Sequence, residues 1–242
     1  MEVLQILRKV KLFQNLSLAE MELILKEGRL INTSKGKHLF YQGDEAKNLY
    51  VVLEGKLKLT QLSEEGNQIV LRILGAGEPM AAISFFENAL FPATAVAVEK
   101  STCIYWPHEN FSSLMEKVPL LATGVIQVLI SRIQELQDRF RELATDEVQQ
   151  RIAKALVRLS EKVGQPYKQL GSKGPSFTRD KKMIRIDLPL TRQDIAEMTG
   201  TTAFTVSRLL TLWEKEKIIQ TEKKKILICD LEQLQSLSKK NL

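Results

Sequence analysis

The stretch "LPLTRQDIAEMTGTTAFTVSRLL", residues 188–210, constrains the fold more than any other part of this 242-residue chain. Thr191 and Asp194 form a T-x-x-D capping box, which predicts that a helix begins at Arg192. That helix is expected to end one residue before Gly200, because glycine takes the positive φ of a tight turn without steric cost.

A second helix is expected directly after this turn, capped by the hydroxyl of Thr202. Two helices that cross steeply need a small residue where they approach each other, and Ala196 is suitably placed. Ile195, Val206 and Leu209 fall where apolar side chains should point inward. This spacing predicts a helix-turn-helix.

The charge distribution favours a nucleic acid as the partner of this motif. Residues 1–145 hold 16 basic and 17 acidic side chains, whereas residues 146–242 hold 19 and 12, a net charge of +7. In the DNA major groove, Arg208 would bind a guanine bidentately and Phe204 would pack on a thymine methyl group. The alternative for Arg208 is a surface ion pair with Glu197. The outward positions of the second helix are Thr202, Ala203, Phe204, Ser207, Arg208 and Thr211, and Lys223, Lys224 and Lys225 of a predicted wing hairpin would meet phosphates.

Short strand-like runs occupy the region from about Gly36 to Trp106. Turn signals such as "EEGN" and "GAGE" separate them, with the spacing of an antiparallel barrel or jelly roll. We expect a β-domain with a small helical lead-in.

The next segment predicts a long helix, because "LLATGVIQVLISRIQELQDRFRELAT" contains no proline and has apolar residues alternately three and four positions apart. The pattern favours dimerisation through a coiled-coil seam; the alternative is docking of the helix on its own β-domain. The predicted seam is Ile126, Leu129, Ile133, Leu136, Phe140 and Leu143.

Several function classes are disfavoured by composition. Cys103 and Cys229 are the only cysteines, too few for a disulfide framework, a four-cysteine metal site or an iron–sulfur cluster, and are expected to be buried free thiols. No apolar run is long enough to span a membrane and no signal peptide is evident, which predicts a cytoplasmic protein without membrane contact. No catalytic constellation is present, so an enzyme is not expected.

The order of these parts resembles the CRP/FNR family of bacterial transcription regulators over nearly the full length. "FYQGDEAKNLYVVLEGKLKL" is similar to the family's cyclic-nucleotide-binding β-roll, and "DEVQQRIAKAL", "LPLTRQDIAEMTG" and "TVSRLL" to its hinge, first and recognition helices. The resemblance implies an α+β fold: a β-roll sensor domain (1–117), a dimerisation helix (118–145) and a winged helix-turn-helix domain (146–242). It further implies a homodimer on an inverted-repeat operator, with Arg192 and Gln193 near phosphates and Arg208 reading a guanine. RNA polymerase is a further partner if the protein is an activator.

Two departures from that family's pattern change what is expected. Its cyclic-AMP binders have Gly-Glu for the ribose and Arg-Ser for the phosphate, where this chain has Ala81, Ala82, Pro92 and Ala93. Without those charged groups cyclic AMP is not the expected effector. Phe204 stands where family members often have a glutamate, so the half-site should differ from the usual ones, because phenylalanine cannot accept from cytosine N4.

An apolar effector pocket follows from the same resemblance. A haem, a hydrophobic metabolite or filling by side chains would suit it, and His38 and His108 are the only histidines available to a haem. A rival interpretation is a ligand-binding or haem-based sensor whose winged helix contacts a protein. The predicted pocket residues are Ala82, Ile83, Pro92, Ala93, Ile133, Leu136, Gln137 and Phe140.

Overall fold

The computed structural model describes residues 2–82, 88–167, 183–222 and 225–239. By its internal contacts the chain divides into an N-terminal unit, Met1–Asp138, and a C-terminal unit, Arg139–Leu242. The division falls inside the long helix α4 (Leu120–Thr145), so both units include part of that helix. No single helix in the described ranges is long and apolar enough to cross a membrane.

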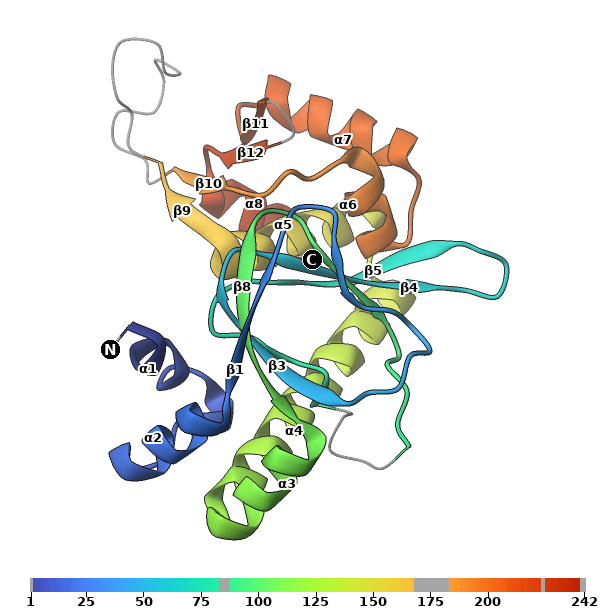
Figure 1. The fold of residues 1–242 in the computed structure, drawn as a ribbon. Helices are drawn as coiled ribbons and strands as arrows, with labels where there is room; N and C mark the ends of the chain where they lie inside the picture. Colours follow the sequence, from blue (N-terminus) through green and yellow to red (C-terminus); the bar gives the residue numbers. More distant parts are fainter. Residues whose placement is uncertain (1, 83–87, 168–182, 223–224, 240–242) are drawn as a thin grey trace. The chain divides into compact units, whose positions relative to one another are not determined.

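The N-terminal unit is a β-roll made of two four-stranded antiparallel sheets (Figure 1). One has the order β1-β8-β3-β6 and the other β2-β7-β4-β5, the two-sheet arrangement expected of a jelly roll. The strands are β1 (Arg29–Thr33), β2 (His38–Phe40), β3 (Asn48–Glu54), β4 (Leu57–Leu62), β5 (Gln68–Leu74), β6 (Pro79–Met80), β7 (Thr94–Ala97) and β8 (Ser101–Pro107).

Most of these strands were readable in the sequence, and the predicted run "QIVLRIL" coincides with β5. The sequence did not reveal β1, which pairs with β8 about seventy residues further along the chain. Buried and exposed side chains alternate only weakly along β1, because Leu30 is largely exposed while Ile31 is only half-buried. Pairing with a distant strand, rather than local pattern, therefore stabilises β1.

Helices cover one end of the β-roll. They are α1 (Glu2–Leu7), the 3₁₀ turn η1 (Lys11–Phe13), α2 (Leu18–Glu27), α3 (His108–Lys117) and the first turns of α4. Trp106 is fully buried among them, and its indole nitrogen donates to the Ile24 carbonyl at 2.8 Å. Gly124 of α4 lies so close to the N-terminal segment that an added Cβ would stand 2.1 Å from the Leu12 carbonyl oxygen.

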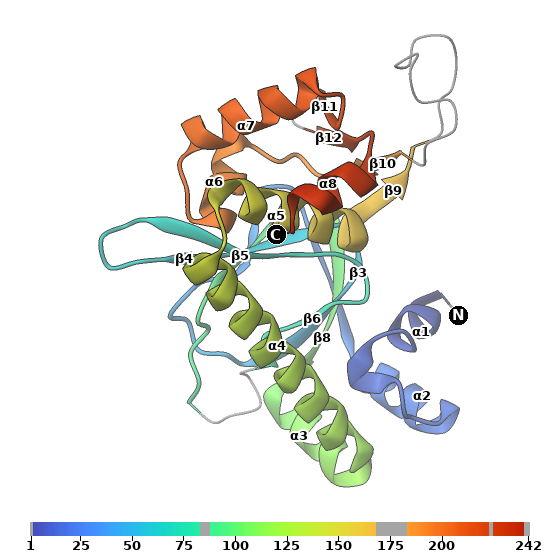
Figure 2. The same ribbon diagram turned by 180° about the vertical axis from the view of Figure 1, so that it is seen from behind.

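The C-terminal unit is a winged helix-turn-helix built on a four-stranded sheet of order β11-β12-β10-β9. Figure 2 shows α5 and α8 side by side, with α7 above them in this view. The elements are α5 (Val148–Val163), β9 (Gly164–Pro166), β10 (Ile184–Ile186), α6 (Arg192–Thr199), α7 (Ala203–Lys215), β11 (Ile219–Glu222), β12 (Lys225–Ile228) and α8 (Leu231–Leu237).

Candidate DNA-binding and effector sites

The turn between α6 and α7 follows the predicted local chemistry. The Thr191 hydroxyl accepts from the Asp194 amide at 3.0 Å, and the Asp194 carboxylate accepts from the Thr191 amide at 2.9 Å, which closes the capping box. Gly200 ends α6 with φ +61° and ψ +49°, and the Thr202 hydroxyl caps α7 by accepting from the Thr205 amide at 3.2 Å. The predicted helix bounds are thus confirmed.

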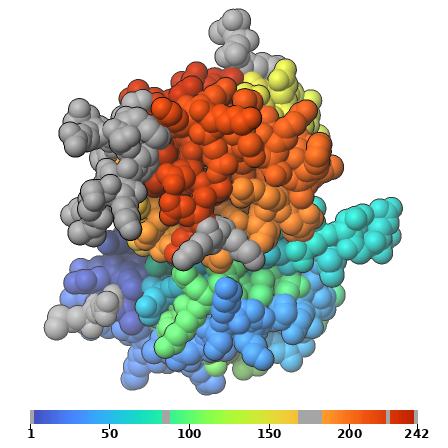
Figure 3. Space-filling view, turned by 90° about the horizontal axis from the view of Figure 1, so that it is seen from above, coloured from blue at the N-terminus to red at the C-terminus, as the bar shows by residue number. Residues whose placement is uncertain are grey.

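Helix α7 has one buried and one exposed face, as predicted. Val206, Leu209, Leu210 and Trp213 are buried, and Ile195 and Ala196 of α6 are buried with them. In Figure 3 the orange atoms of this part of the chain reach the surface over a broad area. Phe204 is 78% exposed at the first turn of α7, an unusual position for a large apolar side chain. The positions Thr202, Ser207, Arg208 and Thr211 are also exposed, and Ala203 is half-buried.

Arg208, the residue predicted to contact a guanine, is exposed. No ion pair joins Arg208 to Glu197 in the described structure; Glu197 instead accepts a hydrogen bond from the Gln193 side-chain amide at 3.0 Å. Arg192 is half-buried and donates to the Thr221 hydroxyl of β11 at 3.3 Å. The first helix is therefore connected to the wing.

The wing hairpin consists of β11 and β12, paired from Ile219↔Ile228 to Glu222↔Lys225. Lys225 forms an ion pair with Asp187 and so is already engaged within the unit. Lys223 and Lys224 lie outside the described residues.

Helix α4 exposes an apolar stripe, which we define as Ile126, Ile130, Ile133, Leu136, Phe140 and Leu143. Leu136 is 62% exposed and Phe140 75% exposed. Leu129, expected in the seam, is half-buried and packs against the core beneath α3 and α4, whereas Ile130, which is not part of the predicted seam, is exposed. The heptad pattern located the stripe but could not tell which residue at its edge meets the β-roll.

The residues of the predicted effector pocket differ in their surroundings. Ala93 is buried and Ala82 half-buried, but Pro92 is exposed. Ile133, Leu136, Gln137 and Phe140 are exposed on α4, so they are not enclosed by the residues that the structure describes. Ile83 lies outside the described residues.

Ala81 has a left-handed backbone, with φ +63°. This is the position where the resemblance to cyclic-AMP binders places a glycine, and glycine is the residue for which such a φ has little cost. The backbone of this turn is thus of the glycine type although the glycine is replaced.

The positive charge of Arg72 on β5 is neutralised by carboxylates of the same unit. Arg72 pairs with Glu78 at 2.6 Å and with Glu135 of α4 at 3.5 Å, and Arg132 also reaches Glu135 at 2.9 Å. Arg72 is mostly buried, so both carboxylates compensate a charge that would otherwise be poorly solvated. An anionic ligand would have to compete with them.

Histidine and cysteine side chains offer little to a metal or haem. His38 is exposed and stacks on Tyr41, and His108 is half-buried at the start of α3, near the Ser112 hydroxyl. Cys103 and Cys229 are buried free thiols, as expected; burial raises the pKa of Cys103 to about 12, and burial with the nearby Asp230 charge raises the pKa of Cys229 to about 11. Both thiols therefore stay protonated near neutral pH.

Known families match both halves of the chain. Residues 30–118 match the family described as "Cyclic nucleotide-binding domain", and residues 150–237 match the "Crp-like helix-turn-helix domain". A β-roll of this type, followed by a long helix and a winged helix-turn-helix, defines a DNA-binding transcription regulator rather than an enzyme.

Individual relatives extend this comparison to nearly the whole chain. The cyclic AMP receptor protein of Thermus thermophilus is 29% identical over 209 residues, which cover 86% of this chain and 88% of that protein. The fumarate and nitrate reduction regulatory protein of Yersinia pestis is 29% identical over 204 residues, 84% of this chain and 76% of that protein. The structure of FixK2 from Bradyrhizobium japonicum has the same fold, with a TM-score of 0.71 and 16% identity over 89% of this chain and 99% of that one. The chain belongs to the CRP/FNR family of transcription regulators.

Replacing Ala81 by glycine should stabilise the N-terminal unit. Relief of the left-handed strain is worth about 1–2 kcal/mol, and the extra freedom of glycine in the unfolded chain offsets about 0.4–1 kcal/mol. We expect Ala81→Gly to raise the free energy of unfolding in urea by about 0.5–1 kcal/mol. The matched control Ala76→Gly, at an exposed residue without positive φ, should lower it. A loss of stability in both variants would contradict the interpretation.

Proposed function

We propose that the protein acts in the cytoplasm as a homodimer on an inverted-repeat operator, under an effector other than cyclic AMP. The observation that supports this most directly is the face of α7, which presents Phe204, Ser207 and Arg208 outward from a buried, capped helix. Such a rigid, exposed helix has the geometry that helix-turn-helix proteins insert into the major groove. The net charge of +7 beyond residue 145 supplies attraction to phosphates.

We assign recognition of the DNA bases to the two large side chains of this face. Arg208 binds a guanine through O6 and N7, and Phe204 packs on a thymine methyl group. Because phenylalanine has no acceptor for cytosine N4, this position reads by apolar contact instead of a hydrogen bond. Arg192, Gln193, Thr202, Ala203, Ser207, Thr211, Lys223 and Lys224 are assigned to phosphates and neighbouring base edges.

Dimer formation is assigned to the apolar stripe of α4. A row of large apolar side chains that the chain itself leaves exposed is stabilised when a second copy of α4 covers it. A two-fold dimer then places two α7 helices in successive major grooves about 34 Å apart.

The effector proposal rests on charge. Ala82, Pro92 and Ala93 offer no group that answers a ribose hydroxyl or a phosphate, and Arg72 is already paired with Glu78 and Glu135. We therefore propose that the effector is apolar, or that the protein is controlled without a bound ligand. In either case, control acts by shifting the α4 seam between two states. Neither histidine is buried, which gives haem little support. RNA polymerase is the further partner if the outcome is activation.

The function is tested by selecting bound sequences from random DNA and then replacing Arg208 by lysine. Lysine keeps the charge but loses the bidentate contact, so affinity for the selected operator should fall about 10- to 100-fold while binding to random DNA stays within about twofold. Both affinities are measured by fluorescence anisotropy at one salt concentration. If the wild-type protein selects no sequence, the rival proposal, a winged helix that contacts a protein, is favoured instead.

Phe204 is tested by removing only the methyl group from its target. When the contacted thymine of the selected operator is replaced by uracil, the wild-type protein should bind about fourfold more weakly, the value of one buried carbon of about 0.8 kcal/mol. Phe204→Ala should bind both operators equally, whereas the control Arg208→Ala should still distinguish them. Equal discrimination by Phe204→Ala and wild type would assign the methyl contact to another residue.

The dimer is tested by placing a charge in the stripe. Leu136→Glu should weaken dimerisation at least about tenfold in sedimentation equilibrium, because the carboxylate would be buried without a partner. The control Gln127→Glu adds the same charge at an exposed polar position of α4 and should leave the dimer intact. An unchanged dimer in Leu136→Glu would place the interface elsewhere.

A further inference from the structure

One guanidinium in the C-terminal unit joins the ends of two helices. Arg151, on the first turns of α5, donates from Nη1 to the Asp146 carbonyl at 2.8 Å, just beyond the end of α4. It also donates from Nε to the Thr199 carbonyl at 2.9 Å and from Nη2 to the Gly200 carbonyl at 3.3 Å. The last two carbonyls belong to the end of α6 and to the turn that leads into α7.

The chemistry of these acceptors explains why an arginine stands here. The last carbonyls of a helix have no partner within the helix and form the negative end of its dipole. A cation that donates to them is stabilising, and the planar fork of arginine can address several acceptors in fixed directions. The three donors of lysine share one nitrogen, so they do not reproduce the contacts that Arg151 makes from three separate nitrogens.

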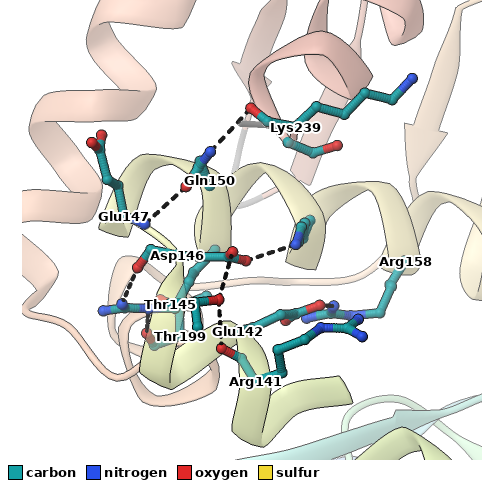
Figure 4. A network of polar contacts seen from close by, with 12 residues as sticks. Arg141, Glu142, Thr145, Asp146, Glu147, Gln150, Arg158, Thr199 and Lys239 are labelled. Atoms are coloured by element: carbon teal, nitrogen blue, oxygen red, sulfur yellow. Dashed lines mark hydrogen bonds and ion pairs between the residues drawn. The ribbon is translucent and has the colours of Figure 1, made fainter. Parts of the chain in front are cut away.

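Neighbouring contacts hold the same junction (Figure 4). Lys154 pairs with the Asp146 carboxylate at 2.7 Å, and Arg158 pairs at 2.6 Å with Glu142, which is buried. An added Cβ on Gly200 would stand 3.0 Å from a methyl carbon of Leu143, so the last turn of α4 also meets the helix-turn-helix turn directly. The end of α4, the start of α5 and the α6–α7 turn therefore form one connected junction.

We infer that Arg151 is a positioning residue for operator recognition: it fixes the α6–α7 turn to the end of α4 and so sets the place of α7 relative to that helix end. The inference rests on the proposed dimer and operator, and it adds the residue that determines their spacing. Within one half-site α7 reads bases with its own side chains. On a full operator, affinity also depends on the distance between the two α7 helices. The junction determines that distance, because it holds each α7 to the end of its own α4.

Arg151→Lys tests this role. Affinities are measured for three DNAs: the operator that the wild-type protein selects, the same operator with the spacer changed by one base pair, and DNA with a single half-site. We expect the variant to bind the single half-site within about twofold of wild type but the full operator about tenfold more weakly, the weight of a lost charge-assisted hydrogen bond. Its preference for the selected spacer should shrink.

The matched control is Arg158→Lys. It makes the same change on the same helix and in the same junction, but among the described residues Arg158 makes a single contact, from Nη1 to the Glu142 carboxylate, and a lysine can keep that ion pair. The control should keep wild-type affinity and spacer preference, and thermal melts show whether each variant is folded.

Three outcomes would overturn the inference. Arg151→Lys could keep the full spacer preference and operator affinity, in which case the junction does not set the spacing. It could lose half-site and operator affinity by the same factor, in which case Arg151 merely supports the fold of the domain. A wild-type protein that selects no operator at all would overturn the proposed function together with this inference, and that result is recognised before any variant is made.

Discussion

The unsatisfied carbonyls at helix ends are the constraint on which the C-terminal unit depends. A helix-turn-helix places two helix ends, one turn and one helix start within a few residues, so polar backbone groups are concentrated there. The Gly200 amide donates to the Ala196 carbonyl, the Thr202 hydroxyl caps the helix that follows, and Arg151 donates to the carbonyls of Thr199 and Gly200. Each of these groups answers a different unpaired backbone group, which makes the angle between α6 and α7 well defined.

Helix α4 has to satisfy several neighbours along its length. Its first turns bury Leu121, Val125 and Val128 against the N-terminal core. Further along, the same face bears charge, with Glu135 on Arg72 in the N-terminal unit and Glu142 on Arg158 in the C-terminal unit. Apolar packing tolerates small sliding, whereas ion pairs with partly buried side chains hold discrete geometries. A helix bound in this way is suited to two alternative positions rather than to gradual bending.

Local chemistry made much of this architecture predictable. The capping box at Thr191, the turn at Gly200 and the heptad spacing in α4 depend on neighbours within a few positions, and the structure contains all three. The contacts of Arg151 were not readable, because its acceptors are backbone carbonyls up to 49 residues away and carry no sequence signal. The half-burial of Leu129 and the left-handed φ of Ala81 depend on how α4 and the β6 turn are seated on the roll, which no periodicity encodes.

The two departures that the resemblance implies share one chemical trend, since both place apolar side chains where the family pattern has polar ones. In the β-roll, alanine and proline stand at the positions that the resemblance matches to the cyclic-AMP contacts, and Arg72 pairs with the carboxylates of Glu78 and Glu135. In the proposed function, regulation would require a difference in free energy between two positions of α4, which a ligand, the partner helix or DNA itself could supply. The junction around Arg151 is where such a difference reaches α7, because it attaches the end of α4 to the turn that precedes the recognition helix.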